Sequence, residues 1–262
     1  MAKLIDGKKI SGEIKDELKE KVAQLKEKGV EVTLAVIQVG NDPASTVYVG
    51  NKKKACAYIG INSLAYELQE ETTQEELLNL VRQLNDREDV NGILVQLPLP
   101  AHIDEDTVIR TIAPEKDVDG FHPQSVGLLS IGQKGFVSCT PAGIIQLLKR
   151  SGIEIDGKEC VVVGRSNIVG KPLALLLLQA DATVTVCHSK TPDLADQCRR
   201  ADILVSAAGQ AGLITADMVR PHAVVIDVAM NRGVDGKLCG DVDFGAVAQR
   251  ADYITPVPGG VG

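Results

Sequence analysis

Short apolar segments alternate with helix-forming segments along the chain, and this alternation constrains the fold more than any other feature. In the first half the pattern predicts strands near residues 32–40, 62–68 and 91–98, with helices near 44–59 and 73–85 between them. Strands separated by helices in this way form a parallel sheet, because each helix returns the chain to the end of the sheet where the previous strand began. The first half is therefore predicted to be an α/β domain of the βαβ type.

The second half repeats the alternation with almost continuous apolar runs, which are typical of strands covered on both faces. A helix at about 141–150 precedes expected strands near 160–164, 182–188, 202–209, 223–230 and 252–257. We predict a first domain over 1–139 and a Rossmann-like second domain over 140–255, with 256–262 returning towards the first. The segment 104–136 is expected to be loop-rich, because prolines and glycines punctuate it.

The net charge and the length of the apolar runs argue against nucleic acid and membrane as partners. Over 262 residues the chain has 28 basic and 35 acidic residues, a net charge of −7, which is the wrong sign for a general nucleic-acid binder. The longest apolar run, Leu173 to Leu178, is far shorter than the roughly 20 residues that span a bilayer. We therefore expect no nucleic-acid partner and no membrane segment.

The six cysteines lie far apart, and no CxxC pair or Cys/His cluster suggests a zinc site. Cys160 and Cys187 fall inside apolar runs, which indicates buried, reduced thiols. The N-terminus also lacks the apolar region of a secretory signal. Together these features predict a cytoplasmic protein.

The segment 161–178 combines an apolar strand, a glycine turn and the start of a helix. Such a turn presents backbone N–H groups to an anion. It is not a Walker A loop, because Pro172 stands where a magnesium-binding Ser or Thr is needed. It also departs from GxGxxG, since Ser166 replaces the second glycine and the later glycine is displaced to Gly170. By itself the turn is compatible with phosphate binding and with an ordinary strand-to-helix connection.

The end of the next expected strand favours NADP over NAD. An NAD site usually has an Asp or Glu there for the ribose 2′-hydroxyl, whereas this chain has His188, Ser189 and Lys190. Together with Arg165 they would form a donor-rich pocket for a 2′-phosphate. The alternative is that Arg165 and Lys190 are solvated surface charges and that His188 packs or caps.

The helix expected near 44–59 presents a candidate catalytic face. Tyr48 and Lys52 are four residues apart and share one side of this helix with Ser45. The positive charges of Lys53 and Lys54 disfavour protonation of Lys52, so that a partly desolvated Lys52 could exchange protons near neutral pH. The alternative is that the three lysines form an exposed basic face.

Further polar residues follow the first-half strands, at the edge where ligands bind in open α/β sheets. Gln96 lies at the end of one strand, and Asp117 and Asp119 lie in a later loop. A carboxylate there would accept two parallel hydrogen bonds from a ring N–H and an exocyclic amine, the donor pair of pterins and guanines. The alternatives are a capping role for Gln96 and metal binding by the aspartates. We assign no metal ligand, because no further oxygen ligand has suitable spacing.

Seven motifs occur in order along the chain. They are Ser45-x-x-Tyr48-Val49-x-x-Lys52-x-Lys54-Ala55, VQLPLP, PEKDVDGFHP, CTPAG, VVVGRSNIVGKP, VVIDV and YITPVPGGVG. Together they resemble the bifunctional methylenetetrahydrofolate dehydrogenase/methenyltetrahydrofolate cyclohydrolase family of the FolD type, over essentially the whole chain. The resemblance implies two domains with a folate cleft between them, a homodimer built through the cofactor domains, and a place in one-carbon metabolism and purine biosynthesis.

The resemblance also implies a role for each candidate residue. Lys52 would be the proton-transfer residue of the cyclohydrolase step, Gln96 its partner, and Tyr48 the residue beside the folate ring. The other implied substrate-binding residues are Asp119, which would anchor the pterin edge, and Gly259 and Gly260, which would let the backbone close against folate and nicotinamide. The implied cofactor-binding residues are Gly164, Arg165, Ser166, Ile168 and Ser189, of which Arg165 and Ser189 would meet the 2′-phosphate.

The implied activity has two steps: NADP-dependent oxidation of 5,10-methylenetetrahydrofolate to 5,10-methenyltetrahydrofolate, and hydrolysis of that product to 10-formyltetrahydrofolate. Two other hypotheses remain open, a dehydrogenase of amino or hydroxy acids and a non-catalytic NADP-binding regulator. The chain departs from the usual family pattern at Leu128, Ser138, Gln210 and Ala229. The family also normally continues past PGGVG into a helix.

Overall fold

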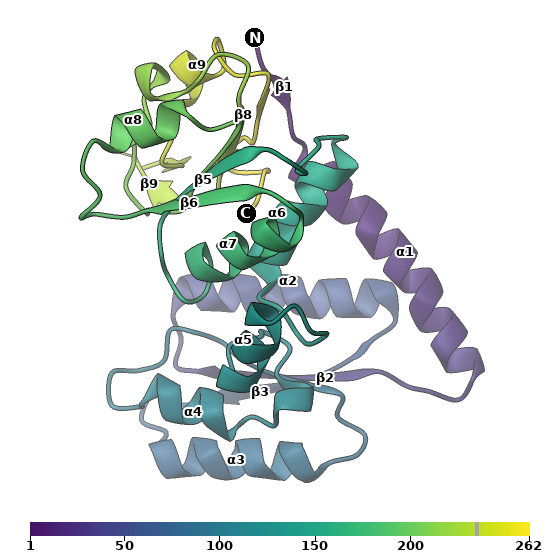
Figure 1. Cartoon of the computed structure of the whole chain (residues 1–262). Coiled ribbons are helices and arrows are strands. Elements are labelled where there is room, and N and C mark those ends of the chain that lie inside the picture. Colours follow the sequence, from purple (N-terminus) through teal and green to yellow (C-terminus); the bar gives the residue numbers. More distant parts are fainter. Residues whose placement is uncertain (234–235) are drawn as a thin grey trace. The chain divides into compact units, whose positions relative to one another are not determined.

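The computed structural model describes residues 1–233 and 236–262, which form two compact units (Figure 1). One unit is Gly12–Val137, and the other combines Met1–Ser11 with Ser138–Gly262. The second unit is discontinuous because β1 (Lys3–Leu4) pairs in parallel with β11 (Tyr253–Ile254). The division of functions between 1–139 and 140–255 stays a prediction, but the compact units place the first eleven residues with the second half.

The unit Gly12–Val137 contains a parallel sheet of order β3-β2-β4. Its strands are β2 (Thr33–Val39), β3 (Asn62–Leu68) and β4 (Gly92–Val95), and its helices include α2 (Pro43–Ile59) and α3 (Gln74–Asp86). These elements confirm the predicted βαβ arrangement. In Figure 1 the sheet lies between α2 and α3, so that the unit has three layers.

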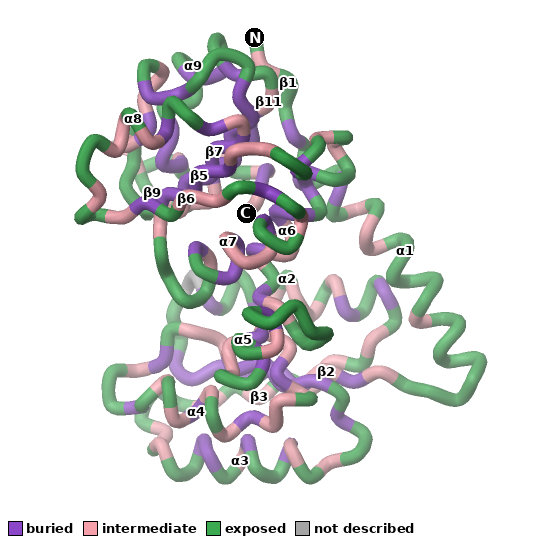
Figure 2. The backbone as a smooth tube through the Cα atoms, in the orientation of Figure 1, coloured by how far each residue is buried: buried purple, intermediate pink, exposed green. Residues whose placement is uncertain are grey.

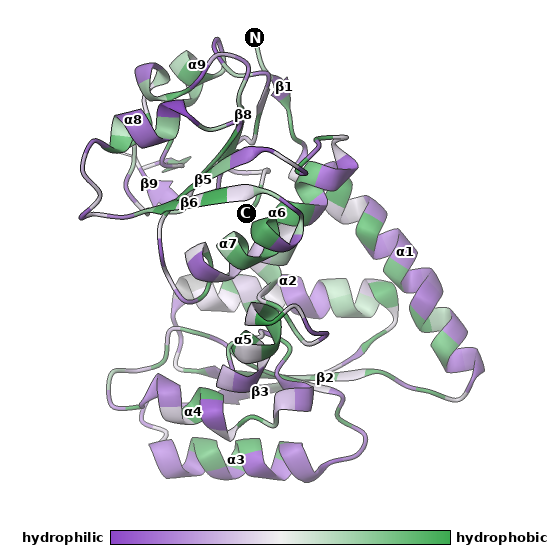
Figure 3. Ribbon diagram, in the orientation of Figure 1, coloured by the Kyte–Doolittle hydropathy of each residue, from purple (hydrophilic) through white to green (hydrophobic). Residues whose placement is uncertain are grey.

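Alternation along β2 explains why both faces of this sheet are covered. Ala35 and Ile37 pack with the buried leucines of α3, whereas Val36 packs with Val49 of α2. The helix α1 (Gly7–Glu27) starts in the other unit and continues into this one. In Figure 3 apolar segments recur along α3 between polar ones, and its buried residues Leu77, Leu78, Val81 and Leu84 supply this packing.

The segment 104–136 is more ordered than its sequence predicted. It contains α4 (Glu105–Thr111), the 3₁₀ turn η1 (Pro114–Lys116) and α5 (Pro123–Ser130). Both helices have side-chain caps, since Asp104 accepts a hydrogen bond from the Thr107 N–H at 2.9 Å and His122 accepts one from the Gln124 N–H at 3.0 Å. Such caps satisfy the first backbone donors and allow short helices to form between loops.

The second unit is built on a parallel sheet of order β1-β11-β8-β7-β5-β6, which confirms the predicted Rossmann-like architecture. Its other strands are β5 (Glu159–Val163), β6 (Thr183–Cys187), β7 (Ile203–Ser206) and β8 (Val224–Asp227), and a separate antiparallel pair is formed by β9 (Asn231–Arg232) and β10 (Leu238–Cys239). The helical elements are α6 (Cys139–Arg150), α7 (Gly170–Gln179), α8 (Leu194–Arg199), η2 (Ala216–Met218) and α9 (Phe244–Val247). In Figure 1, α6 and α7 lie on one face of this sheet and α8 on the other.

The central strands β5, β7 and β8 form the core of the unit, and nearly all of their residues are buried (Figure 2). Leu173 and Leu177 of α7, four residues apart, are both fully buried. Burial raises the pKa of the Cys160 and Cys198 thiols to about 12, so these cysteines act as small apolar core residues. In the part of the chain that the structure describes, no helix has both the length and the apolar character to cross a membrane.

Candidate active site

The start of α2 is fixed by polar contacts at the carboxyl end of β2. Asp42 caps the helix by accepting a hydrogen bond from the Ser45 N–H at 2.8 Å. The buried Gln38 donates from Nε2 to the Gly40 carbonyl at 3.2 Å and to the Thr46 hydroxyl at 3.0 Å. Sequence reasoning missed Gln38, although a polar residue inside an otherwise apolar strand was a usable signal. These contacts set the angle at which α2 leaves the sheet.

Lys52 and Gln96 meet at this edge of the sheet. The Lys52 ammonium donates to the Gln96 Oε1 atom at 3.0 Å. Gln96 follows β4, where its backbone N–H donates to the Ile37 carbonyl at 2.8 Å and its Nε2 donates to the Leu97 carbonyl at 2.7 Å. Because the Gln96 amide is held on its nitrogen side, its oxygen is directed towards Lys52. The structure thus brings together two residues that are 44 positions apart.

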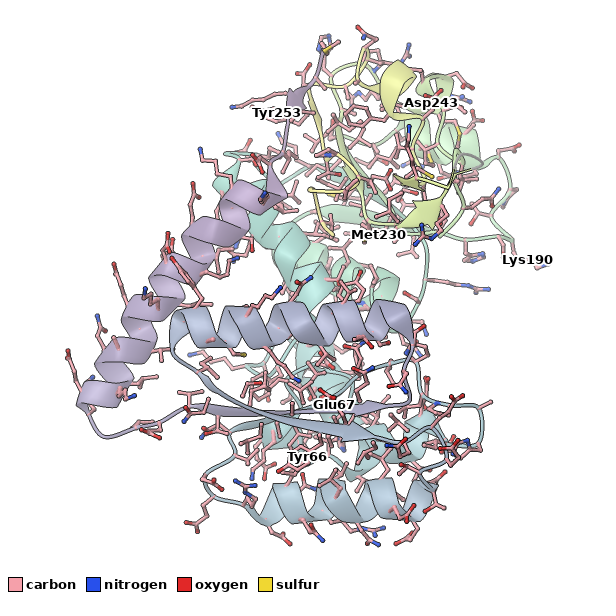
Figure 4. All side chains as sticks on the ribbon, turned by 180° about the vertical axis from the view of Figure 1, so that it is seen from behind. Tyr66, Glu67, Lys190, Met230, Asp243 and Tyr253 are labelled. Atoms are coloured by element: carbon pink, nitrogen blue, oxygen red, sulfur yellow. The ribbon has the colours of Figure 1, made fainter. Side chains whose placement is uncertain are left out.

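The three consecutive lysines of α2 have different surroundings. Lys53 forms an ion pair with Glu67 of β3 at 2.7 Å, in which the Lys53 side chain is 39% exposed and the Glu67 side chain 71%. Figure 4 labels Glu67 and Tyr66, which are neighbours on β3 and point to opposite faces of the sheet. Lys54 is exposed. The predicted exposed basic face therefore describes Lys54, whereas the half-buried Lys52 and Lys53 turn towards Gln96 and Glu67.

The two aspartates after η1 have separate roles. Asp117 is only 2% exposed and accepts hydrogen bonds from the His122 N–H and the Ser125 hydroxyl, both at 2.8 Å. Asp119 is partly buried, and this burial raises the pKa of its carboxyl to about 6, with Lys52 opposing the rise and Asp117 adding to it. Asp117 thus holds the loop, and Asp119 lies within electrostatic reach of Lys52.

Tyr48 lies one helical turn before Lys52 on α2 and is 49% exposed. Its position on the same helical face is the one that the sequence spacing predicted. An aromatic ring that is half exposed beside a polar cluster offers an apolar surface to a flat ligand. The unit Gly12–Val137 contains all four of the candidate residues Tyr48, Lys52, Gln96 and Asp119.

The predicted cofactor turn is a tightly packed connection between β5 and α7. A Cβ atom added to Gly164 would lie 2.4 Å from the Ala207 carbonyl oxygen, and one added to Gly170 would lie 2.2 Å from the Gly164 carbonyl oxygen. Gly164 also has φ +131°, which disfavours other residues. The Ser166 hydroxyl accepts from the Val169 N–H at 3.1 Å and from the Gly170 N–H at 3.4 Å. Glycines are thus required here by backbone packing.

The exposed part of this turn is attached to α6 by a residue that departs from the family pattern. Ser138, which is buried, donates from its hydroxyl to the Ile168 carbonyl at 2.7 Å. The Ile168 side chain itself is 46% exposed, and Arg165 and Ser166 are exposed as well. The side chains predicted to bind a cofactor are therefore exposed, while the backbone of the turn is fixed by the hydrogen bond from Ser138.

The loop after β6 carries the predicted 2′-phosphate residues. The His188 N–H donates to the Thr191 hydroxyl at 2.8 Å, and the Lys190 N–H donates to the His188 ring at 3.1 Å. His188 thus caps this loop, as one of the two sequence interpretations proposed. Ser189 and Lys190 are exposed, and Figure 4 shows Lys190 projecting outward.

The C-terminal glycines pack against the first turn of α1 within their own unit. The Gly7 N–H donates to the Gly259 carbonyl at 3.0 Å, and a Cβ added to Gly7 would lie 1.7 Å from the Gly260 carbonyl oxygen. Gly259 has φ +101°, and a Cβ on Gly260 would lie 2.5 Å from the Pro256 carbonyl oxygen. Sequence reasoning missed Gly7, whose need for a bare Cα arises only from this contact.

Sequence comparison finds one family over both halves of the chain. The profile described as "Tetrahydrofolate dehydrogenase/cyclohydrolase, catalytic domain" matches residues 5–119, and the profile of the corresponding "NAD(P)-binding domain" matches residues 138–262. A relative named "Bifunctional protein FolD" from Lachnoclostridium phytofermentans is 70% identical over 262 residues, which is 100% of this chain and 93% of the relative.

Solved structures of similar proteins have the same fold. The bifunctional methylenetetrahydrofolate dehydrogenase/cyclohydrolase of Campylobacter jejuni is 53% identical, with a TM-score of 0.97 over 100% of this chain and 93% of that one. The Trypanosoma brucei enzyme, solved with NADP and an inhibitor, is 45% identical, with a TM-score of 0.93 over 99% of this chain and 92% of that one.

Proposed function

The chain belongs to the tetrahydrofolate dehydrogenase/cyclohydrolase family, and on this premise we propose how its residues carry the two activities. The protein oxidises 5,10-methylenetetrahydrofolate to 5,10-methenyltetrahydrofolate with NADP and hydrolyses that product to 10-formyltetrahydrofolate. This activity replaces the two other hypotheses, an acid dehydrogenase and a non-catalytic regulator. The observation that carries the assignment of residues is the 3.0 Å contact between Lys52 and Gln96 beside Asp119.

Lys52 is the proposed proton-transfer residue of the hydrolysis. In its amine form it accepts a proton from the water that attacks the methenyl carbon, and in its ammonium form it returns a proton to the ring nitrogen as the C–N bond breaks. The net reaction consumes one water and releases one proton. Gln96 orients Lys52 through the 3.0 Å hydrogen bond. General acid–base help of this kind typically contributes about 10² to 10⁴ in rate.

Asp119 is the proposed anchor of the pterin. Its carboxylate can accept two parallel hydrogen bonds from a ring N–H and an exocyclic amine. Partial burial supports this role, because a shielded carboxylate gains more from such donors than an exposed one. Tyr48 would flank the folate ring, and Gly259 and Gly260 would give the close backbone approach to folate and nicotinamide.

The residues of the second unit fit a dinucleotide. The turn between Gly164 and Gly170 packs too closely against backbone for a Cβ at either glycine, and the cationic Arg165 and the hydroxyl-bearing Ser166 on it are exposed. Gly164, Arg165, Ser166 and Ile168 would hold the cofactor, and Ser189 would meet the 2′-phosphate together with Arg165. NADP, when bound, supplies the hydride acceptor for the oxidation. The protein's residues bind and orient it.

We propose that residues 1–139 provide the folate and catalytic groups and that 140–255 bind the cofactor, with 256–262 contributing to the folate side. We also propose a homodimer through the cofactor unit. The edge strand β6 supports this, because it lies at the end of the sheet and Val186 on it is 38% exposed. Sedimentation of Val186→Lys tests it: the variant should be monomeric, and an unchanged dimer would contradict this interface.

A cytoplasmic location is a further part of the proposal. Cys56, Cys160, Cys187 and Cys198 are buried thiols, and such cysteines are typical of reducing compartments. Cell fractionation followed by immunodetection tests this location, and recovery of the protein outside the cytoplasmic fraction would contradict it.

One assay tests the proposed function as a whole. The protein is mixed with NADP and 5,10-methylenetetrahydrofolate, and the absorbance of the methenyl product is followed. We expect the signal to rise with reduction of NADP and then to decay as the methenyl group is hydrolysed. Protein that binds NADP but turns over neither folate would refute the function.

A further inference from the structure

A buried carboxylate in the proposed cofactor unit accepts hydrogen bonds from three consecutive residues of one loop and from two other side chains. Asp241 has 0% exposure and lies between β10 and α9. Five neutral groups donate to it: the Ser206 hydroxyl (2.8 Å) and the N–H groups of Ala208 (2.8 Å) and Gly209 (3.2 Å) donate to Oδ2, and the Gln210 N–H (2.7 Å) and the Asn231 side-chain amide (3.0 Å) donate to Oδ1. Three of these donors are consecutive backbone N–H groups.

The loop that Asp241 holds lies at the switch point of the sheet. β5 is followed by β6 on one side, and β7 then lies on the other side of β5, with Val163 opposite Ser206. In open α/β sheets, ligands bind at the carboxyl ends of the strands where the order reverses in this way. The loop 207–210 directly follows β7, and a Cβ on Gly164 would touch its Ala207 carbonyl. This loop therefore lies directly against the glycine turn and borders the same proposed dinucleotide site.

Asp241 is itself fixed from two other elements. The Asp227 carboxylate at the end of β8 accepts hydrogen bonds from the N–H groups of Asp241 and Val242, both at 3.0 Å. Ile214 pairs with the same segment through its N–H, which donates to the Asp241 carbonyl at 3.0 Å. Gly240 allows this approach, since a Cβ on it would lie 1.8 Å from an Asp227 oxygen. Asp241 thus connects β8 rigidly to the loop after β7.

Successive backbone N–H groups that point to one spot form an anion-binding nest. In this protein the nest of residues 208–210 is filled by the Asp241 carboxylate, so its N–H groups are not available to phosphate oxygens. The carboxylate also prevents the loop from adopting other conformations, because both of its oxygens accept at least two donors. In the turn between Gly164 and Gly170, the Val169 and Gly170 N–H groups donate to the Ser166 hydroxyl, so the exposed residues 165–168 are the part of this turn that a dinucleotide can contact.

We propose that Asp241 is a positioning residue for cofactor binding, which sets the wall of the dinucleotide site by filling the nest of the loop 207–210 with its carboxylate. The inference rests on the proposed cofactor site. It adds a residue that need not touch the cofactor and that acts through the loop.

The substitution Asp241→Asn tests the charge and the acceptor together. The amide places an NH₂ group against backbone donors, whichever way it is turned, while the volume is unchanged. We expect the NADP dissociation constant, measured by calorimetry, to rise at least tenfold, and the KM for NADP to rise with a smaller change in kcat. Methenyl hydrolysis without cofactor should stay within about twofold, because Lys52 and Gln96 belong to the other unit.

A matched control is Asp243→Asn, two residues further along. Asp243, labelled in Figure 4, is exposed and caps α9 by accepting from the Ala246 N–H at 3.4 Å. An Asn keeps a capping oxygen there, so NADP affinity should not change. An unchanged NADP dissociation constant in Asp241→Asn would overturn the proposal. An equal loss of NADP binding and of methenyl hydrolysis would also overturn it, since that result indicates a general folding defect.

If Asp241→Asn does not fold, Ser206→Ala decides the question. This change removes one donor to Asp241 and no atom of the loop itself. The proposal then requires a several-fold rise in the NADP dissociation constant with normal hydrolysis, and unchanged affinity would refute it. Wild-type turnover of both folates is measured alongside, so failure of this inference is distinct from failure of the proposed function.

Discussion

The proposed catalytic set of the first unit and the proposed cofactor turn of the second are built in different ways. Lys52, Gln96 and Asp119 are side chains from three separate elements, which meet at one edge of a small sheet. The turn from Gly164 to Gly170 is held by backbone packing, and its functional side chains are exposed. One region therefore depends on single functional groups. The other depends on a shaped backbone, with affinity spread over several contacts.

This contrast predicts the largest effect at Lys52. In Lys52→Ala the proton-transfer group is lost, so methenyl hydrolysis should fall by about 10²- to 10⁴-fold. NADP affinity should not change, because the substitution leaves the backbone of the cofactor turn intact. Stopped-flow decay of the methenyl absorbance measures the first quantity, and calorimetry measures the second.

The control for this prediction is Lys53→Ala on the same helix. Lys53 pairs with Glu67 at the surface, and an exposed ion pair of this kind contributes about 0–1 kcal/mol. We expect normal hydrolysis in this variant. Wild-type hydrolysis rates in Lys52→Ala would end the assignment of the catalytic set.

A smaller effect, on NADP affinity, is expected at Ser189 in the proposed cofactor site. An aspartate there would repel a 2′-phosphate, and losing a hydrogen bond to a charged group costs about 1.5–3 kcal/mol. The NADP dissociation constant of Ser189→Asp should therefore rise about 10- to 100-fold. NAD serves as the internal control, since it has no 2′-phosphate, and its affinity should change little. Equal losses for both cofactors would place Ser189 elsewhere in the site.

The smallest effect concerns the pH dependence of Asp119. Its pKa is raised by burial to about 6, so the native state binds the proton more tightly than the unfolded state does. The stability that this proton provides is fully present below about pH 4 and is lost as the pH rises through about 6. Asp119→Asn should therefore raise the melting temperature at pH 8 by about 2–4 °C, which corresponds to about 1 kcal/mol after allowance for partial exposure.

The same substitution should weaken folate binding, because the amide offers only one acceptor to the two pterin donors. Asp106→Asn on α4 is the control, since Asp106 is exposed, and we expect no change in melting temperature or in folate KM. A lower melting temperature for Asp119→Asn at pH 8 would mean that the carboxylate stabilises the fold, contrary to its raised pKa.

The helices and strands were predicted correctly where apolar runs and capping residues indicate the same boundaries. The expected strand near 62–68 matches β3, and the helix expected near 44–59 matches α2 to within one residue. The segment 104–136 was harder, because its helices are short and depend on caps at Asp104 and His122 rather than on long apolar patterns.

The candidate site shows the same limit. Spacing placed Tyr48 and Lys52 on one face and so separated Lys52 from Lys53 and Lys54, but it did not show which residue each lysine contacts. The distinction arises from contacts with other strands: Gln96 after β4 and Glu67 on β3. Similarly, nothing local marks Asp241 as a residue that holds the loop after β7.

The sequence by itself determined the parallel α/β architecture, the glycine turn and the family, because periodicity and ordered motifs are properties of the chain. Only the tertiary structure decided that β1 joins the sheet of the second half, that Gly7 must lack a side chain, and that Asp241 fills the nest of residues 208–210. These facts depend on contacts between residues far apart in sequence, which local patterns do not encode.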